Sequence, residues 1–116
     1  FGRFEALITP LNDEPAKTSR RSHARALTQG QPAAEAMRAF AAWTRQFDRP
    51  SFIARPACFD WPWIVWYAWT FLGDNPFGFK AVCASSWFEG RGKTFKVDLP
   101  HIAVEDAALQ LEHFLR

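Results

Sequence analysis

Apolar residues recur with a helical period in two parts of the chain. Between residues 32 and 47 they follow the i, i+4, i+7, i+11 spacing of one helix face, at Ala36, Phe40, Trp43 and Phe47. Pro32 suits the first turn of this predicted helix. After Pro100 a second stripe predicts a final amphipathic helix, whose buried face consists of Val104, Ala107, Leu111 and Phe114 or Leu115.

Other segments favour extended structure. Residues 1–11 (FGRFEALITPL) alternate in part, with Phe4, Ala6 and Ile8 on one side, which predicts a strand that runs into a loop. Residues 51–57 (SFIARPA) form a β-prone run of strand length, and residues 94–99 (TFKVDL) predict a strand or an extended segment. Residues 79–88 fit a strand or a short helix, and the pattern does not choose between them.

An aromatic run follows the second of these strands. Residues 61–72 are uncharged and predict a buried helix, since 12 residues are too few for a membrane span. Asp60 can cap its N-terminus, Pro62 can sit in its first turn, and Gly73 is a natural stop. Residues 73–78 (GDNPFG) have the composition of a turn.

Residues 12–30 are polar and lack apolar periodicity. They predict a long surface loop, with a short helical turn around residues 22–27. A basic cluster within it (Lys17, Arg20, Arg21, Arg25) suits either phosphate contacts or a solvated loop.

The order of strands and helices indicates an α/β fold with a sheet covered by helices. A length of 116 residues favours a single domain that spans residues 1–116. The net charge of +2 is too small to attract nucleic acid by overall charge. Cys58 and Cys83 lie 25 residues apart without the spacing of a zinc site, so a reduced, cytoplasmic setting fits best. No membrane segment and no signal peptide are visible.

Two carboxylates lie where a purely solvating role is unattractive. Asp60 stands at the strand-to-helix junction, and Asp106 lies about one turn into the last helix, five positions after His101. Carboxylate oxygens are the ligands that Mg²⁺ or Mn²⁺ prefers, and a histidine that titrates near neutrality can take a proton from an attacking water. Helix capping by Asp60, a helix-dipole role for Asp106 and a loop role for His101 are the alternatives.

These residues carry a resemblance. The FD of ARPACFDWPWI resembles the second motif of the DEDD-type 3′→5′ exonucleases of the ribonuclease H-like fold, and H-x4-D at His101 and Asp106 resembles the third motif of their histidine-bearing branch, DEDDh. The extended run FDWPWIVWYAWTFLGDNPFGF is similar to a bacterial exoribonuclease-like subgroup. GRFEALITPL looks like the third strand of that sheet. The resemblance covers essentially the whole chain.

The resemblance implies a ribonuclease H-like mixed sheet of five strands flanked by helices. It implies that Asp60 and Asp106 bind metal, that His101 is the general base, and that the cofactor is a pair of Mg²⁺ or Mn²⁺ ions. The partners implied are the 3′ ends of single-stranded RNA or DNA.

One element of the family pattern is missing. The first motif, D-x-E, occurs nowhere in the 116 residues. Since the chain begins with Phe1 instead of Met, we expect the N-terminal strands either to lie upstream or to be truly absent. We expect weak or no nuclease activity from this chain, and self-association through an exposed sheet edge.

Several roles stay open at this stage. Most rings of the aromatic run are expected in the core (Trp61, Trp66, Tyr67, Trp69), whereas Trp63 could stack on a terminal base. Asn75 could shape the substrate cleft or only its own turn.

A non-catalytic module of the same fold, binding nucleic acid or protein, is the alternative to an enzyme. An unrelated aromatic-rich α/β domain is the third hypothesis. The nuclease hypothesis requires Asp60, Asp106 and His101 to converge.

Overall fold

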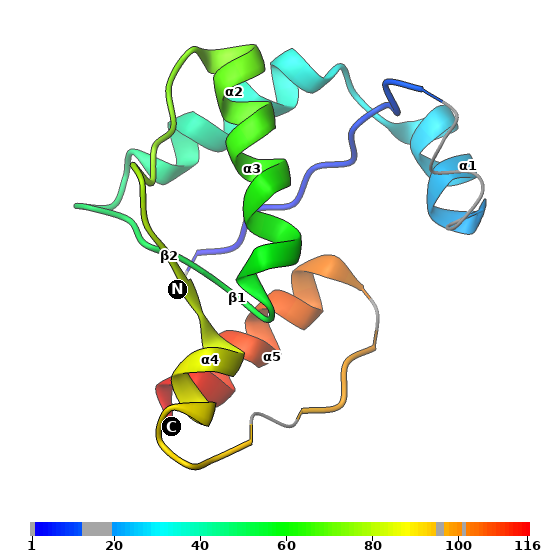
Figure 1. The fold of residues 1–116 in the computed structure, drawn as a ribbon. Coiled ribbons are helices and arrows are strands. Elements are labelled where there is room, and N and C mark those ends of the chain that lie inside the picture. Colours follow the sequence, from blue (N-terminus) through cyan, green and yellow to red (C-terminus); the bar gives the residue numbers. More distant parts are fainter. Residues whose placement is uncertain (1, 13–19, 95–96, 101) are drawn as a thin grey trace.

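The computed structural model describes residues 2–12, 20–94, 97–100 and 102–116, and for residues 20–22 only the backbone. In this part the chain is mixed α/β, with five helices and one two-stranded sheet (Figure 1). The elements are α1 (Arg20–Gln29), α2 (Ala33–Thr44), β1 (Phe52–Ala54), α3 (Ala57–Leu72), β2 (Ala81–Cys83), α4 (Ala84–Glu89) and α5 (Ala103–Leu115).

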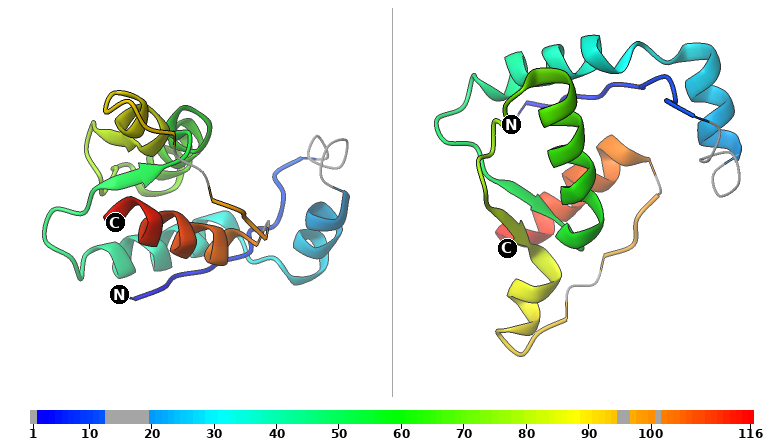
Figure 2. Two further views of the ribbon diagram at one scale, coloured as in Figure 1. Left: turned by 90° about the horizontal axis from the view of Figure 1, so that it is seen from below. Right: turned by 45° about the horizontal axis from the view of Figure 1, so that its top comes forward.

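The sheet is parallel and is built around α3. β1 pairs with β2 in the register Phe52 to Ala81, Ile53 to Val82 and Ala54 to Cys83. A parallel pair needs a crossover connection, and the 16-residue α3 supplies it, so β1, α3 and β2 form a βαβ unit. α3 also packs on α2, which crosses behind it in Figure 1. α5 contacts β1 and lies on the other side of this strand from α3 (Figure 2, left).

The fully buried apolar positions are occupied mostly by small side chains. Among the described residues they are Ala26, Ala33, Ala36, Met37, Ala41, Ala54, Ala57, Ala68 and Ala84. Alanine lets helix backbones approach closely, and the larger rings then pack around the rim of these contacts. One chain of rings joins the N-terminal segment to the sheet, running Phe4, Phe40, Phe77, Phe52 with centroid separations of 5.5, 5.9 and 5.6 Å.

The helices at the periodic segments are confirmed. α2 and α5 occupy the predicted positions, although α2 ends at Thr44, before Phe47. The short turn expected in residues 22–27 is a full helix, α1, of 10 residues. Residues 79–88 adopt both alternatives in succession, since β2 passes directly into α4. The stop at Gly73 is confirmed, because this glycine adopts the left-handed conformation with φ of 66°.

The strand predicted at residues 1–11 is wrong for the described residues 2–12. Only a single bridge forms there: the Thr9 N–H donates to the Gln31 carbonyl over 2.9 Å, and the Gln31 N–H donates to the Leu7 carbonyl over 2.7 Å. An extended segment becomes a strand only beside a partner of several residues, and here the partner is one residue. Thr94 and residues 97–99 are likewise in no strand.

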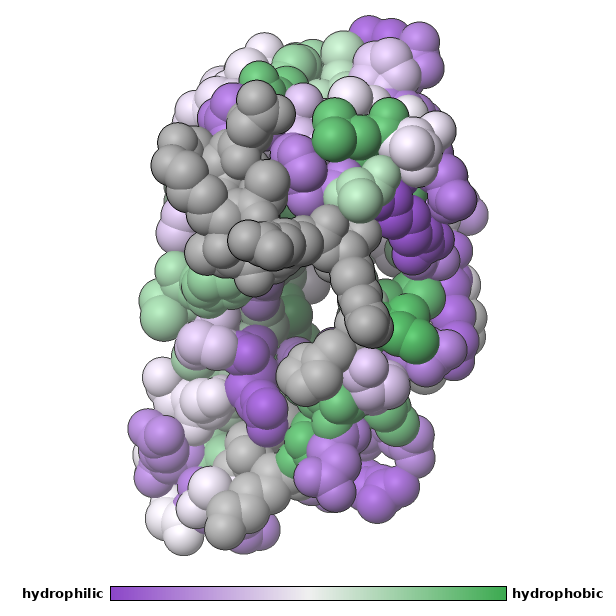
Figure 3. Space-filling model, turned by 90° about the vertical axis from the view of Figure 1, so that its right-hand side faces the viewer, coloured by the Kyte–Doolittle hydropathy of each residue, from purple (hydrophilic) through white to green (hydrophobic). Residues whose placement is uncertain are grey.

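The stripe predicted as buried on α5 is only partly covered. No α5 residue is fully buried, and Leu115 is 59% exposed. Apolar periodicity identifies the face of a helix that can be buried. How much of that face is buried depends on the element that packs against it. On the side that faces right in Figure 1, hydrophobic and hydrophilic residues are interspersed among the coloured residues (Figure 3).

Candidate functional site

Asp60 lies in the first turn of α3 but does not cap it. The helix begins at Ala57, with Pro56 as its N-cap residue, and no side chain caps it by a hydrogen bond. The predicted N-cap role is therefore wrong, as is the place of Pro62, which lies inside the helix. Pro56 has extended backbone angles (φ −79°, ψ 148°), and the helix after it begins at Ala57, four residues before the predicted start at residue 61.

The Asp60 carboxylate is half-buried, and this burial raises its pKa from the ordinary value of 3.8. Among the described residues it has neither a hydrogen bond nor an ion pair to offset the lost hydration. A carboxylate in this position weakens the fold, since an apolar or amide side chain there would not lose hydration of a charge. Its presence favours a functional role over a stabilising one.

We expect Asp60→Asn to stabilise the protein at neutral pH. The carboxyl ionises more readily in the unfolded chain than in the folded one. The free energy of unfolding should therefore fall as pH rises from the unfolded pKa through the raised folded pKa. Because the group is partly exposed and the α3 dipole favours its charge, the gain should be below about 1 kcal/mol at pH 7. Urea denaturation between pH 3 and 7 measures it, and lower stability of the variant at pH 7 would contradict the assignment.

Asp106 lies in the first turn of α5, half-buried, beside the exposed Glu105. Its backbone N–H donates to the Ile102 carbonyl over 2.8 Å, the first helical bond of α5. A first-turn carboxylate is favoured by the helix dipole, so the electrostatic role and the metal-ligand role are compatible there. His101 lies outside the described residues.

Both helices that carry the candidate carboxylates contact β1. Within the described residues no group of three or more His, Cys, Asp or Glu side chains is placed to hold a metal ion. Since His101 is not among them, convergence of Asp60, Asp106 and His101 stays a prediction.

The aromatic run is less buried than its sequence predicts. Trp66 and Trp69, expected in the core, are 48% and 52% exposed, and Trp63 is 60% exposed. Trp61 and Tyr67 are half-buried. Residues 57–72 have an apolar residue on nearly every side, and α2 with the sheet covers only one side of the helix.

Asn75 is 7% exposed and holds the turn after α3. Its side-chain oxygen accepts a hydrogen bond from the Phe77 N–H over 3.0 Å, and its carbonyl accepts one from the Gly78 N–H, also over 3.0 Å. This Asx turn favours the structural explanation for Asn75.

Of the four residues in the basic cluster, only Arg25 has a described side chain. Lys17 is outside the described residues, and the side chains of Arg20 and Arg21 are not described. Arg25 is exposed on α1, where its Nε donates to the Gln29 side chain over 3.3 Å. This bond along one helix is compatible with both a solvated surface and a phosphate contact.

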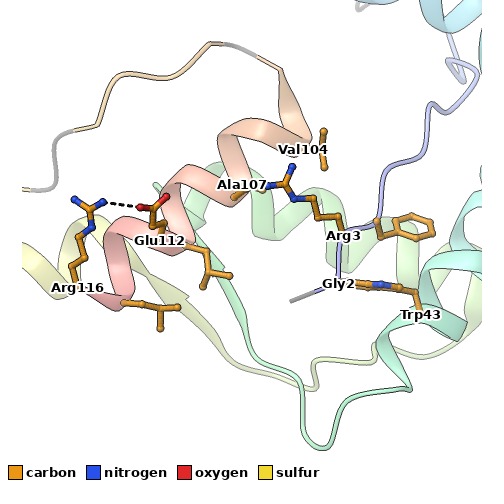
Figure 4. A pocket seen from close by; sticks show the side chains of 11 residues that line it. Gly2, Arg3, Trp43, Val104, Ala107, Glu112 and Arg116 are labelled. Carbon is orange, nitrogen blue, oxygen red and sulfur yellow. Dashed lines mark hydrogen bonds and ion pairs between the residues drawn. The ribbon is translucent and has the colours of Figure 1, made fainter.

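Sequence reasoning missed two features of the molecule. The first is a groove of about 560 Å³ between the N-terminal segment and α5. Figure 4 shows the Arg3 side chain reaching from one wall toward Val104 and Ala107 on the other, with Trp43 beside Gly2 and the Glu112 to Arg116 ion pair at one end. The two walls come from segments about 100 residues apart, so no local pattern indicates the groove.

The second missed feature is Cys83, the last residue of β2. Hydrogen bonds from the Ser86 hydroxyl and backbone N–H, with further backbone donors at Ala57 and Ser85, lower the pKa of its thiol, and burial opposes them. Its separation of 25 residues from Cys58 fits no metal-site spacing, so the sequence alone indicates no role for Cys83.

Comparison with protein-family models and with curated protein sequences gives no match for this chain. Among the described residues no helix is long and apolar enough to cross a membrane.

Proposed function

We propose that this chain is a metal-dependent 3′→5′ exonuclease domain that acts on single-stranded nucleic acid ends and carries no D-x-E motif within its 116 residues. The proposal rests on the position and environment of Asp60. This carboxylate lies in the first turn of α3, does not cap that helix, is half-buried with a raised pKa, and stands in the FDW block that resembles the second motif of the DEDD-type exonucleases.

In this proposal Asp60 and Asp106 are metal ligands, and His101 takes the proton from the attacking water. When bound, Mg²⁺ or Mn²⁺ ions would stabilise charge on the attacking and leaving oxygens. The described residues do not by themselves fit such a pair of ions, because two carboxylates carry too little charge and no larger group is present among them. The family pattern would add two carboxylates from a D-x-E motif, which these 116 residues do not contain.

Within the α/β class, we propose a ribonuclease H-like fold. Support comes from the order of the elements and from the unfinished sheet: β1 pairs with β2 and with no other strand among the described residues. The remaining strands would then lie between β1 and the extended N-terminal segment. Among the described residues, ring contacts through Phe4, Phe40, Phe77 and Phe52 link that segment to β1.

We expect the 116-residue chain alone to be inactive or nearly so. With Mn²⁺ and 3′-labelled single-stranded RNA or DNA, turnover should be at least about a thousandfold below the roughly 10 s⁻¹ typical of enzymes. Gel analysis of end-labelled products measures it, and Asp60→Asn serves as the background control. Robust trimming by the wild-type chain that Asp60→Asn abolishes would refute the incomplete metal site while supporting the nuclease assignment.

The second candidate function is a non-catalytic binding module of the same fold. The exposed rings of Trp63, Trp66 and Trp69 favour it, since large apolar patches mark interaction sites. The reading frame ahead of the Phe1 codon separates the two candidates. A D-x-E between apolar strand residues there supports the enzyme, and a start codon close to Phe1 supports the module.

A further inference from the structure

The outer side of α3 is a continuous exposed face without charge. Every exposed residue of the helix belongs to it: Cys58, Phe59, Pro62, Trp63, Trp66, Trp69 and Thr70. We call this set the α3 outer face. The spacing of residues 59, 62, 63, 66, 69 and 70 is i, i+3, i+4, i+7, i+10 and i+11, which places them along one stripe of a helix. Asp60 does not belong to the stripe.

This stripe has the pattern of a helix-packing surface. Residues 59–70 repeat at the spacing by which one helix contacts another, yet α2 and the sheet pack on the opposite side of α3, where Ala57 and Ala68 are buried. A helix that is apolar on all sides is normally covered on all sides. The α3 outer face therefore lacks its partner within the described chain.

The chemistry of the face restricts the partner. Nucleic acid binding needs cations that neutralise phosphates, and the α3 outer face offers none. A charged protein surface would lose hydration without a counter-charge. An uncharged aromatic surface is the suitable partner, and a second copy of the same face provides one without repulsion.

The exposed area is sufficient for such a pair. Phe59, Trp63, Trp66 and Trp69 are 67%, 60%, 48% and 52% exposed. With rings of about 200 Å² each, they offer roughly 450 Å² per copy. Two copies would bury roughly 900 Å² through these rings alone, and the flanking residues bring the total to the lower limit of specific interfaces, about 1,000 Å².

We propose that the protein forms a symmetric homodimer in which the α3 outer faces of two copies pack on each other. This inference is independent of the proposed nuclease function, because it uses neither Asp60 nor Asp106. It assigns the surplus of exposed tryptophans to an interface between protein chains, and it leaves the groove beside α5 open.

Sedimentation velocity between about 1 and 200 μM, with a reducing agent, tests the interface. We expect wild type to convert from monomer to dimer in this range, and the double variant Trp63→Ser, Trp66→Ser to dimerise at least tenfold more weakly. The matched control is Phe79→Ser, which removes a ring that is 95% exposed in the turn before β2 and should leave dimerisation unchanged.

A second readout needs no tryptophan variant. Cys58 lies on the α3 outer face, so its alkylation rate should fall as protein concentration rises through the dimerisation range. A wild type that stays monomeric at 200 μM would overturn the proposal. Equal weakening of dimerisation in the double variant and in Phe79→Ser would overturn it as well. Binding of a labelled single-stranded oligonucleotide by wild type and not by the double variant would assign the face to nucleic acid instead.

Discussion

Gly30→Ala is expected to destabilise the N-terminal half of the molecule by about 3 kcal/mol. An added Cβ would lie 2.6 Å from the Thr9 backbone nitrogen and 2.9 Å from the Ile8 carbonyl carbon, and it would also meet the Ala26 carbonyl oxygen. These are backbone atoms, which cannot turn aside as a flexible side chain can. Relief of the overlap would break the two hydrogen bonds between residues 7–9 and Gln31, each worth about 1 kcal/mol, and would add backbone strain.

Gly2→Ala is the matched control for this substitution. A Cβ on Gly2 would meet only Trp43, with Nε1 at 3.5 Å, which is an ordinary contact. Its effect should stay within about 0.5 kcal/mol. Urea denaturation followed by tryptophan fluorescence compares the two variants, and amide hydrogen exchange at Thr9 and Gln31 separates local opening from global unfolding. Equal stability of Gly30→Ala and wild type would contradict the close approach of residues 8 and 30.

Ala68→Phe is expected to cost about 3 kcal/mol or more and to disrupt the packing of α3 on its neighbours, α2 and the sheet. Ala68 has no exposed surface. An aromatic ring in a closely packed site forces side chains out of their rotamers and moves the backbones apart. Such a loss is a large fraction of the 5–15 kcal/mol stability typical of a domain of this size, so we expect a clear fall in the urea midpoint.

The same substitution at Ala42 provides the comparison. Ala42 lies on α2 but is exposed, so the new ring would enter solvent and change stability by about 0.5 kcal/mol or less. Similar urea midpoints for Ala68→Phe and Ala42→Phe would show that α3 is not closely packed at Ala68.

The alanine-rich contacts explain why the aromatic residues are available for binding. Ala36, Ala41 and Ala68 bring helix backbones together, and large rings do not fit between them. Trp63, Trp66 and Trp69 lie on the side of α3 away from α2 and the sheet and are exposed, although burial was expected for Trp66 and Trp69. Their exposure is the structural basis for the proposed interface on α3.

The candidate site was only partly predictable from sequence. The FDW block singles out Asp60, and the structure adds that its carboxylate is half-buried and that this burial raises its pKa. The helix start at Ala57 was missed because two prolines, Pro56 and Pro62, both suit the beginning of a helix, and the sequence gives no local criterion to choose between them. The groove between Arg3 and α5 was missed because its walls are distant in the chain.

Local chemistry determined the positions of α2 and α5, the left-handed stop at Gly73 and the Asx turn at Asn75, since each depends on residues within a few positions of one another. Tertiary structure decided which faces are covered. Residues 1–11 have the pattern of a strand, but among the described residues of this segment only Ile8 has a bridging partner; α3 is apolar on nearly every side but packs on one. Periodicity is a property of a single segment, whereas burial and strand pairing require a second surface, and no sequence pattern states where that surface lies.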